Sequence, residues 1–422
     1  MEKVKVIVIG AGGRGTVYAN CAKENKDKVV VVGVAEPRDF FRERIVKEHG
    51  IPAGNVFRSW EEAARREKFA DVAVVGTQDK MHVEPMRAFA SKGYHVLLEK
   101  PMAPEAEGCR EISRIAKKNG IIFAVCHVLR YTDYTRKMKE IIDSGAIGEI
   151  VSMQHLEPVG YWHFAHSFVR GNWRKESESS SMLLEKSCHD LDWIRYIMDC
   201  RCESVSSFGS LKHFTRKNQP KGASDRCLDC KVGAECPYSA VRFYQDRIKT
   251  NSLGWPVDVI TSDLTVDGVN KALRDGPYGR CVYACDNDVV DNQVVNMSFE
   301  GNRTVSFSMI GCSGFGGRRT TVFGTRGELY GDSDKIKLFD FLTGKHADIE
   351  TKSPEAGFLG GHGGGDPKLF AGFIDAVAAG DSSRILTGPD VSLESHLMVF
   401  AAEKSRRENR VVEMKEMYRG NL

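Results

Sequence analysis

The stretch Val4-Lys-Val-Ile-Val-Ile-Gly-Ala-Gly-Gly-Arg-Gly15 places a short apolar, mostly β-branched run directly before a glycine-spaced turn. A helical pattern follows the turn. In such a unit Gly10 allows the tight turn, Gly12 lets backbone amides approach a pyrophosphate, and Gly15 lets the helix lie close to the sheet. The spacing predicts a dinucleotide-binding unit. The predicted cofactor-binding residues of this turn are Gly10, Gly12, Gly13, Arg14 and Gly15.

The residues after the next predicted strand bear on the choice of cofactor. This strand is followed by Glu36, about 20 residues after the glycines, where NAD-binding proteins place an acid that accepts both ribose hydroxyls. Arg38 is a guanidinium of the kind that holds the 2′-phosphate of NADP. Because Glu36 would repel that phosphate, the sequence favours NAD over NADP.

Composition limits the class of protein. The chain has 422 residues, which favours two domains, and a net charge of +3 with both signs well mixed. This balanced charge gives no indication of a basic surface that would bind nucleic acid or an anionic membrane. The longest apolar runs are strand-sized, and no signal peptide precedes the first strand. We therefore expect a cytoplasmic protein, in which the 12 cysteines are thiols or metal ligands rather than disulfides.

The hydrophobic pattern divides the chain near residue 127. Strands and helices alternate before this point, which predicts a parallel, doubly wound sheet, with strands near residues 4–9, 29–34, 72–75, 95–98 and 121–125. The predicted fold is an α/β dinucleotide-binding (Rossmann) domain over residues 1–127, followed by an α+β domain over residues 128–422.

The second domain is expected to contain a large, mainly antiparallel sheet. An open face on such a sheet is commonly covered by another subunit, so a homo-oligomer is expected. Helical patterns cover residues 135–144, 183–198 and 393–407; strand patterns cover residues 294–299, 304–309, 319–323 and 335–339; a Cys-rich insert lies near residues 212–256.

Glu99-Lys100-Pro101 follows a predicted parallel strand, at the edge of the sheet where ligands bind. Together with Gly76-Thr77-Gln78-Asp79, His82 and the segment 144–150, it resembles the signature of the Gfo/Idh/MocA oxidoreductases, the glucose-fructose oxidoreductase and inositol dehydrogenase family. The resemblance covers nearly the whole chain. It implies hydride transfer between NAD and a secondary hydroxyl of a sugar, sugar acid or cyclitol. It also implies that Thr77, His82, Glu99 and Lys100 lie at the cofactor.

The family has a second motif, an acid four residues before a histidine and another acid three residues after it. Glu185, His189 and Asp192 match it, although the family usually has aspartate at the first position. On a continuous helix Glu185 and His189 would share a face. The resemblance implies that His189 is the general acid/base, that Lys100 binds the substrate hydroxyl and shares its proton, and that Glu185 orients them. The roles of Lys100 and His189 are exchangeable, and a structural histidine is the alternative for His189.

Residues 161–174 mix aromatic rings with charged hydrogen-bond donors, as sugar sites do. The two tryptophans of this segment, Trp162 and Trp173, are equally compatible with a role in the core or in an interface. The glycine-rich segment 360–365, followed by Asp366, is either a loop that closes over a ligand or a surface turn. The substrate-binding candidates are Arg130, Tyr131, Trp162, His163, His166, Arg170, Trp173, Arg174, Asp192 and His362.

Cysteines of the insert have metal-ligand spacing. Cys227 and Cys230 form a C-x-x-C pair and Cys236 follows closely. With Cys281 or Cys285 as the fourth ligand, the favoured residue being Cys281, they predict a structural zinc site. Unligated thiols and a redox-active pair are the alternatives.

Two other classes of function stay open. Some relatives keep NAD bound and cleave a glycosidic bond through transient oxidation, elimination and hydration, and others are non-catalytic nucleotide-binding sensors. Intact Lys100 and His189 argue against the sensor. Turnover of free NAD separates a dehydrogenase from the glycosidase.

Overall fold

The first domain of the computed structural model, which describes residues 2–314, 316–351 and 363–418, contains a six-stranded parallel sheet. The strand order is β3-β2-β1-β4-β5-β6. The strands are β1 (Val4–Ile9), β2 (Val29–Ala35), β3 (Val56–Phe57), β4 (Val72–Val75), β5 (His95–Leu98) and β6 (Phe123–Val125); the helices between them are α1 (Gly13–Glu24), α2 (Asp39–His49), α3 (Trp60–Arg65), α4 (Val83–Ala90) and α5 (Ala106–Lys118).

The predicted parallel sheet is confirmed, and the two-residue β3 is an addition to it. Strands β4, β5 and β6 are almost wholly buried because helices cover both faces of the sheet, which is why they are continuous apolar runs in the sequence. β3 is too short to have a pattern of its own.

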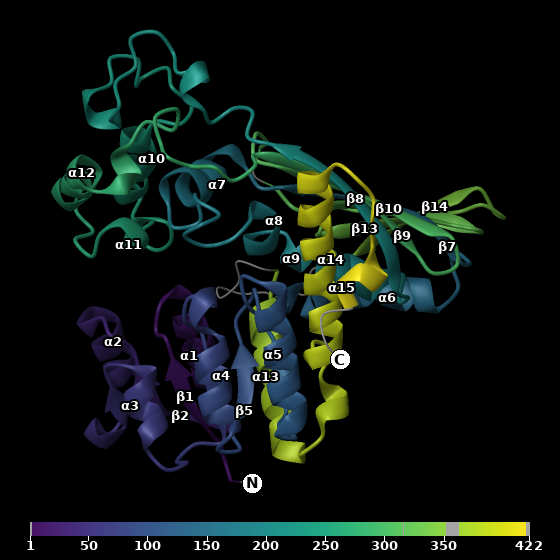
Figure 1. The fold of residues 1–422 in the computed structure, drawn as a ribbon, viewed down its shortest axis with the longest axis horizontal. Coiled ribbons are helices and arrows are strands. Elements are labelled where there is room, and N and C mark those ends of the chain that lie inside the picture. Colours follow the sequence, from purple (N-terminus) through teal and green to yellow (C-terminus); the bar gives the residue numbers. More distant parts are fainter. Residues whose placement is uncertain (1, 315, 352–362, 419–422) are drawn as a thin grey trace.

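The second domain contains a nine-stranded sheet in the order β14-β13-β12-β11-β7-β10-β9-β8-β15 (Figure 1). Neighbouring strands are antiparallel except β7 and β10, so the predicted, mainly antiparallel sheet is confirmed. Its strands are β7 (Ile150–Pro158), β8 (Cys202–Ser210), β9 (Asn292–Phe299), β10 (Arg303–Ile310), β11 (Arg319–Gly324), β12 (Gly327–Gly331), β13 (Lys335–Asp340), β14 (Lys345–Glu350) and β15 (Val412–Glu413).

One helix leads from the first sheet to β7 of the second sheet, and further helices connect β7 to β8. Helix α6 (Asp133–Asp143) follows the first domain, and α7 (Tyr161–Phe164) continues into a wider helical turn, Ala165–Arg170. The short α8 (Met182–Glu185) and α9 (Cys188–Met198) then lead to β8. Side chains of α9 form part of the core beneath the second sheet.

The chain returns to the first domain near its end. Helix α13 (Gly365–Ala379) packs Leu369, Phe370 and Phe373 into the core formed by β1, β2 and β4. Helix α14 (Pro389–Glu408) lies against α5, α9 and β8, and the short α15 (Met414–Tyr418) follows it. Helix α13 packs against α1 and β1 of the first domain (Figure 1), so a division at residue 127 leaves this helix out of the domain to which it packs.

The insert between β8 and β9 has a small core of its own. Its helices are α10 (Ala240–Lys249), α11 (Val257–Ile260) and α12 (Val266–Asp275), and Figure 1 shows them beyond α7, away from the open end of the second sheet. In the part of the chain that the structure describes, no helix is both long and apolar enough to cross a membrane.

Candidate active site

The glycine-spaced turn has the geometry that the sequence predicts. Gly10 has a φ of +84°, and a Cβ there would lie 2.7 Å from the carbonyl oxygen of Gly76. A Cβ on Gly15 would lie 1.9 Å from the carbonyl oxygen of Gly10. Both positions therefore exclude side chains, and the close approach brings the start of α1 against the ends of β1 and β4. No side chain caps α1, which leaves its first amides available to an anion.

Glu36 and Arg38 form a tight pair beside this turn. Arg38 donates to both carboxylate oxygens of Glu36, at 2.7 and 3.1 Å, and the amide of Ala11 donates to the same group at 2.9 Å. Burial opposes ionisation of Glu36, but the hydrogen bonds from Arg38 and Ala11 outweigh it and lower the pKa of the carboxyl. Arg38 also lies over the ring of Phe41, at 4.2 Å. The carboxylate is thus ionised and held where a ribose is expected.

Replacing Glu36 with alanine is expected to reduce the preference for NAD over NADP. The variant loses the carboxylate that repels a 2′-phosphate and frees Arg38 to bind that phosphate. Dissociation constants for NADH and NADPH, measured by fluorescence titration, check the change. Tighter binding of NADPH than NADH by the wild type would contradict the assignment.

Lys100 follows β5, and its surroundings are rigid. Glu99 is buried and accepts a hydrogen bond from Nε of Arg14 at 2.7 Å, while Arg14 also pairs with Asp366 at the start of α13. Burial lowers the pKa of His82, whose ring nitrogens lie 3.0 Å from the carbonyl oxygen of Pro101 and 3.2 Å from that of Thr77. His82 therefore links the loops that follow β4 and β5 through contacts with both of them.

Glu185 and His189 do not lie on one continuous helix, so this expectation is wrong. Helix α8 ends at Glu185, and α9 begins at Cys188. Between them Ser187 has a φ of −99° and a ψ of 8°, outside regular helical geometry. The break turns the chain and lets the backbone of Glu185 face the first domain. Nζ of Lys100 donates to the carbonyl oxygen of Glu185 at 2.6 Å.

The Glu185 carboxyl is buried in a site that opposes its ionisation. Burial is the main cause, and the negative charge of Asp79 adds to it, so the pKa of Glu185 rises to about 8. The hydroxyl of Ser180 donates to Oε1 of Glu185 at 2.6 Å. At neutral pH this carboxyl is mostly protonated and is a hydrogen-bond donor.

Glu185 is expected to make the free energy of unfolding fall as pH rises from 4.5 to about 8. In this range the unfolded carboxyl has lost its proton while the folded one retains it, so the contribution is full below pH 4.5 and is lost as pH rises through 8. The slope from one such group approaches about 1.4 kcal/mol per pH unit. Urea unfolding of wild type and Glu185→Gln at several pH values measures the difference, and parallel pH dependences would contradict the raised pKa.

His189 lies in the first turn of α9, on the other side of the helix break from Glu185. Its ring centroid lies 5.9 Å from that of His127, which lies 5.3 Å from that of His396. All three rings are buried, and burial lowers the pKa of His127 to about 3 and that of His396 to about 4. Neutral His127 therefore adjoins His189, and neutral His396 adjoins His127.

Arg130 and Asp192 pair with each other. Two hydrogen bonds of 2.7 Å join the guanidinium to the carboxylate, and both side chains are buried. Arg130 also donates to the carbonyl oxygen of Leu386, and the hydroxyl of Tyr131 accepts from the amide of the same residue. Burial opposes the charge of Asp192, yet Arg130 holds the pKa of that carboxyl below its usual range. These contacts give the three predicted substrate ligands structural partners.

The predicted substrate-binding segment 161–174 contacts the insert. His166 lies 2.6 Å from the hydroxyl of Tyr244, and burial lowers the pKa of the imidazole to about 3. Arg170 donates to carbonyl oxygens of the insert, and Arg174 pairs with Asp286. Partners in the insert therefore occupy the polar groups of His166, Arg170 and Arg174. Trp162 and His163 contact the ring of Trp255, Trp173 is 41% exposed, and His362 lies outside the described residues.

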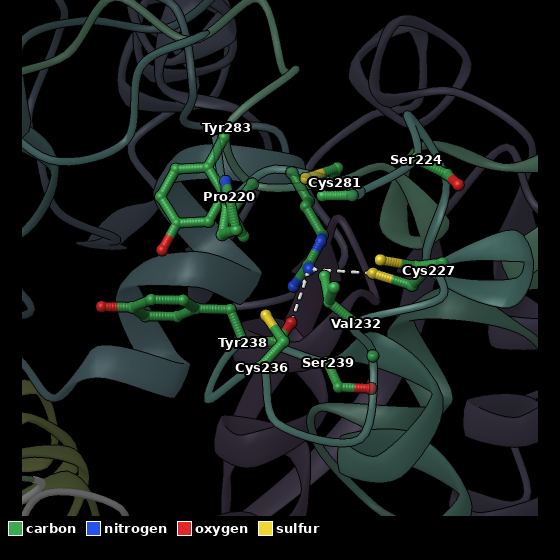
Figure 2. A pocket seen from close by; sticks show the side chains of 14 residues that line it. Pro220, Ser224, Cys227, Val232, Cys236, Tyr238, Ser239, Cys281 and Tyr283 are labelled. Atoms are coloured by element: carbon green, nitrogen blue, oxygen red, sulfur yellow. Dashed lines mark hydrogen bonds between the residues drawn. The ribbon is translucent and has the colours of Figure 1, made fainter. Parts of the chain in front are cut away.

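The four predicted zinc ligands surround one small cavity. Cys227, Cys230, Cys236 and Cys281 all line it, and Figure 2 labels Cys227, Cys236 and Cys281 around it. Yet among the residues that the structure describes, no group of three or more His, Cys, Asp or Glu side chains has positions that could hold a metal ion. The side chains as placed therefore do not form the predicted zinc centre.

Sequence reasoning missed Asp79 and a charged cluster behind α9. Asp79 follows β4, the neighbour of β5, so its place at the same sheet edge as Lys100 could have indicated it. The cluster had no local signal, because its members come from separate helices, strands and loops. It consists of Asp190, His155, Arg318, Glu157 and Lys186, joined by contacts of 2.5 to 3.2 Å.

Comparison with known families decides the identity of the two domains. Residues 4–127 match the oxidoreductase family GFO_IDH_MocA, NAD-binding Rossmann fold, and residues 139–414 match the C-terminal alpha/beta domain of the same family. The chain belongs to the Gfo/Idh/MocA family. It is an oxidoreductase of the NAD-binding type by this membership.

Relatives of this Gfo/Idh/MocA protein are distant. YteT of Bacillus subtilis (strain 168) is 24% identical over 369 residues, which are 82% of each chain. The scyllo-inositol 2-dehydrogenase (NAD(+)) of the same strain is 24% identical over 50% of this chain and 58% of its own. A levoglucosan dehydrogenase solved with NADH has a TM-score of 0.73 at 18% identity, covering 98% of this chain and 99% of its own. This last likeness shows the fold.

The residues of this Gfo/Idh/MocA protein fit NAD. The uncapped start of α1 offers amides to the pyrophosphate, and ionised Glu36 offers acceptors to the ribose. The hydroxyl oxygen of Thr77 is buried and has no hydrogen-bond partner in the described chain. A buried polar atom of this kind at the sheet edge suits a cofactor contact.

Proposed function

We propose that this protein transfers a hydride between NAD and a secondary hydroxyl carbon of a sugar, sugar acid or cyclitol. The contact between Lys100 and the carbonyl oxygen of Glu185 carries the proposal. It brings a lysine at the carboxyl end of β5 beside the segment of the second domain that contains His189. Because ligands of doubly wound sheets bind at this edge, substrate and nicotinamide are expected to meet here.

Each residue of the site has a separate role in the proposed oxidation of the alcohol. Bound NAD supplies the hydride acceptor. His189 takes the hydroxyl proton, since a free histidine has a pKa of ~6.5 and needs no large shift to act as a base. The cationic Lys100 binds the hydroxyl oxygen and stabilises developing negative charge. Glu185 orients Lys100 through its backbone carbonyl oxygen, while its protonated carboxyl hydrogen-bonds to Asp79.

Aromatic rings of α7 and of the insert support a carbohydrate substrate. Trp162 lies 5.6 Å from Trp255, which is 49% exposed, and 5.3 Å from Phe243. The guanidinium of Arg247 lies 5.0 Å from the ring of Trp162. Aromatic faces cover the C–H surface of a sugar, and a guanidinium binds its hydroxyls. The named inositol and levoglucosan dehydrogenases among the similar proteins agree with this substrate class.

A panel of sugars, sugar acids and cyclitols with free NAD tests the proposal. We expect absorbance at the reduced-nicotinamide band to increase with at least one of them, and purified protein to bind NADH. Binding of NADH without hydride transfer to or from any member, with either NAD or NADP, would contradict it.

Redox-assisted elimination and hydration is the second candidate. The 2,7-anhydro-N-acetylneuraminate hydratase of Mediterraneibacter gnavus is 27% identical over 50% of this chain and 53% of its own. An enzyme of this kind would convert anhydrosugars or glycosides without accumulating NADH. Product analysis by NMR, with the NADH absorbance recorded in parallel, separates the two reactions.

We also propose that a second copy of the chain covers the outer face of the nine-stranded sheet. Phe208 of β8 pairs in register with Val294 of β9, and their side chains are 63% and 40% exposed. Tyr330 of β12 is 41% exposed. Large exposed apolar side chains on a sheet favour burial in a subunit interface. The molar mass in solution, measured by light scattering, would be at least twice that of the 46.9 kDa chain.

A further inference from the structure

The insert contains a long segment with little regular structure. Between the end of β8 at Ser210 and the start of α10 at Ala240, the structure has only the two three-residue 3₁₀ turns Arg216–Asn218 and Cys227–Asp229. Loops of this length inside a compact domain are uncommon unless something fixes them. The small apolar core of the insert comes mainly from the helices that follow, with Ala240, Tyr244, Val257, Val269, Leu273 and Tyr278 as its buried members. The segment therefore needs another source of stability.

Backbone contacts bring four cysteines of the insert together. An antiparallel bridge joins Arg226 to Arg280, and the amide of Cys281 donates to the carbonyl oxygen of Asp225 at 2.8 Å. Cys227 and Cys281 are thus neighbours on adjacent chain segments, although they are far apart in the sequence. The turn that follows brings in the next two thiols: the amide of Cys230 donates to the carbonyl oxygen of Cys227, and Cys236 lines the same cavity.

The cavity between these cysteines has room for one small ligand. Its volume is about 20 Å³, enough for one water molecule or one ion. Figure 2 shows Cys227, Cys236 and Cys281 from three directions around this space, with Tyr238 and Tyr283 closing one side. Four cysteines that line one space of this size are the donor set that a tetrahedral thiolate centre requires, once their side chains turn toward it.

The charge around the cavity gives independent support. Arg170 is 3% exposed, and its guanidinium donates to the carbonyl oxygens of Arg280 and Tyr238 and to Sγ of Cys227, at 3.5 Å. None of the contacts of Arg170 within the described residues involves a carboxylate. A buried cation without an anionic partner is costly. Thiolates at the cavity would supply the missing negative charge.

From these observations we propose that Cys227, Cys230, Cys236 and Cys281 bind one structural zinc ion. Four thiols release their protons to solvent and coordinate the metal at about 2.3 Å, with no open position for substrate. Zinc with four thiolates has a net charge of minus two, which Arg170 offsets in part. Sγ of Cys227 accepts from Arg170 and Sγ of Cys281 from Gln219, so these sulfur atoms need rotations about χ1 to reach ligand positions.

Metal content of the full-length protein, purified without added metal, tests this site. We expect about one zinc ion per chain. Cys230→Ser is expected to lose most of this zinc and to lower the melting temperature. Cys285→Ser is the matched control, because Cys285 lies four residues from Cys281 and is half-buried, yet does not line the cavity. Equal zinc loss in both variants would overturn the ligand assignment.

Cobalt substitution keeps the test decisive if Cys230→Ser does not fold. Wild-type protein refilled with Co²⁺ is expected to show thiolate-to-cobalt charge-transfer bands and the visible d–d bands of tetrahedral cobalt. Thiol titration of denatured protein gives the third readout. Wild type without zinc and without these bands would overturn the proposal, whether its thiols are all free or two fewer titrate because of a disulfide.

Discussion

Lys100→Ala and His189→Ala are each expected to lower kcat by about 10²- to 10⁴-fold, as the loss of one general acid or base does. Lys100 lies at the carboxyl end of β5, and its Nζ contacts the carbonyl oxygen of Glu185 in the second domain. His189 is in the first turn of the helix that follows. Steady-state kinetics with the best substrate of the panel measure the loss.

Lys80→Ala is the matched control for the lysine variant. Nζ of Lys80 also donates across the domains, to the carbonyl oxygen of Ser177 at 2.9 Å, but this lysine is exposed. We expect its kcat to stay near that of the wild type. Affinity for NADH is expected to change by no more than a few fold in either catalytic variant. Near wild-type turnover by Lys100→Ala or His189→Ala would end the role assigned to that residue.

Asp192→Asn is expected to lower the free energy of unfolding by about 3–5 kcal/mol. The substitution leaves the buried guanidinium of Arg130 without its carboxylate partner, and both hydrogen bonds of 2.7 Å lose their charge assistance. Urea unfolding measures the loss. The same variant distinguishes the structural role from the substrate-binding role that the motif implies.

The exposed pair Arg136 and Glu140 provides the comparison. Its N···O distance is 2.6 Å, close to that of the buried pair, but its side chains are 65% and 45% exposed. Glu140→Gln is therefore expected to cost less than about 1 kcal/mol. If Asp192→Asn is as stable as Glu140→Gln and instead raises KM alone, Asp192 is a substrate ligand.

Local patterns were enough to predict much of the fold. Strands such as β4 and β5 are continuous apolar runs because both faces of the parallel sheet are covered, and strands such as β9 and β10 alternate because one face is open. The short strand β3 was not predicted, because two residues are too few to show a periodic hydrophobic pattern. The break between α8 and α9 was not predicted either, since residues 183–198 have a helical pattern throughout.

The candidate site was predicted in its residue types but not in its contacts. The glycine turn, Glu36 and Lys100 were found because their chemistry depends on a spacing within one βα unit. The sequence predicts Arg130 and Asp192 as substrate ligands, and nothing in it shows that two residues 62 positions apart pair with each other. Arg170, also predicted to bind the sugar, lies beside Cys227 in the structure.

The sequence by itself determined the dinucleotide-binding turn and the two kinds of sheet, and it supplied the candidate residues for proton transfer, because periodicity and spacing act over a few residues. Only the tertiary structure placed Lys100 against Glu185, packed α13 into the first domain and gathered four cysteines around one cavity. These contacts join residues tens to hundreds of positions apart. The burial that pairs their charges and shifts their pKa values exists only after the chain has folded.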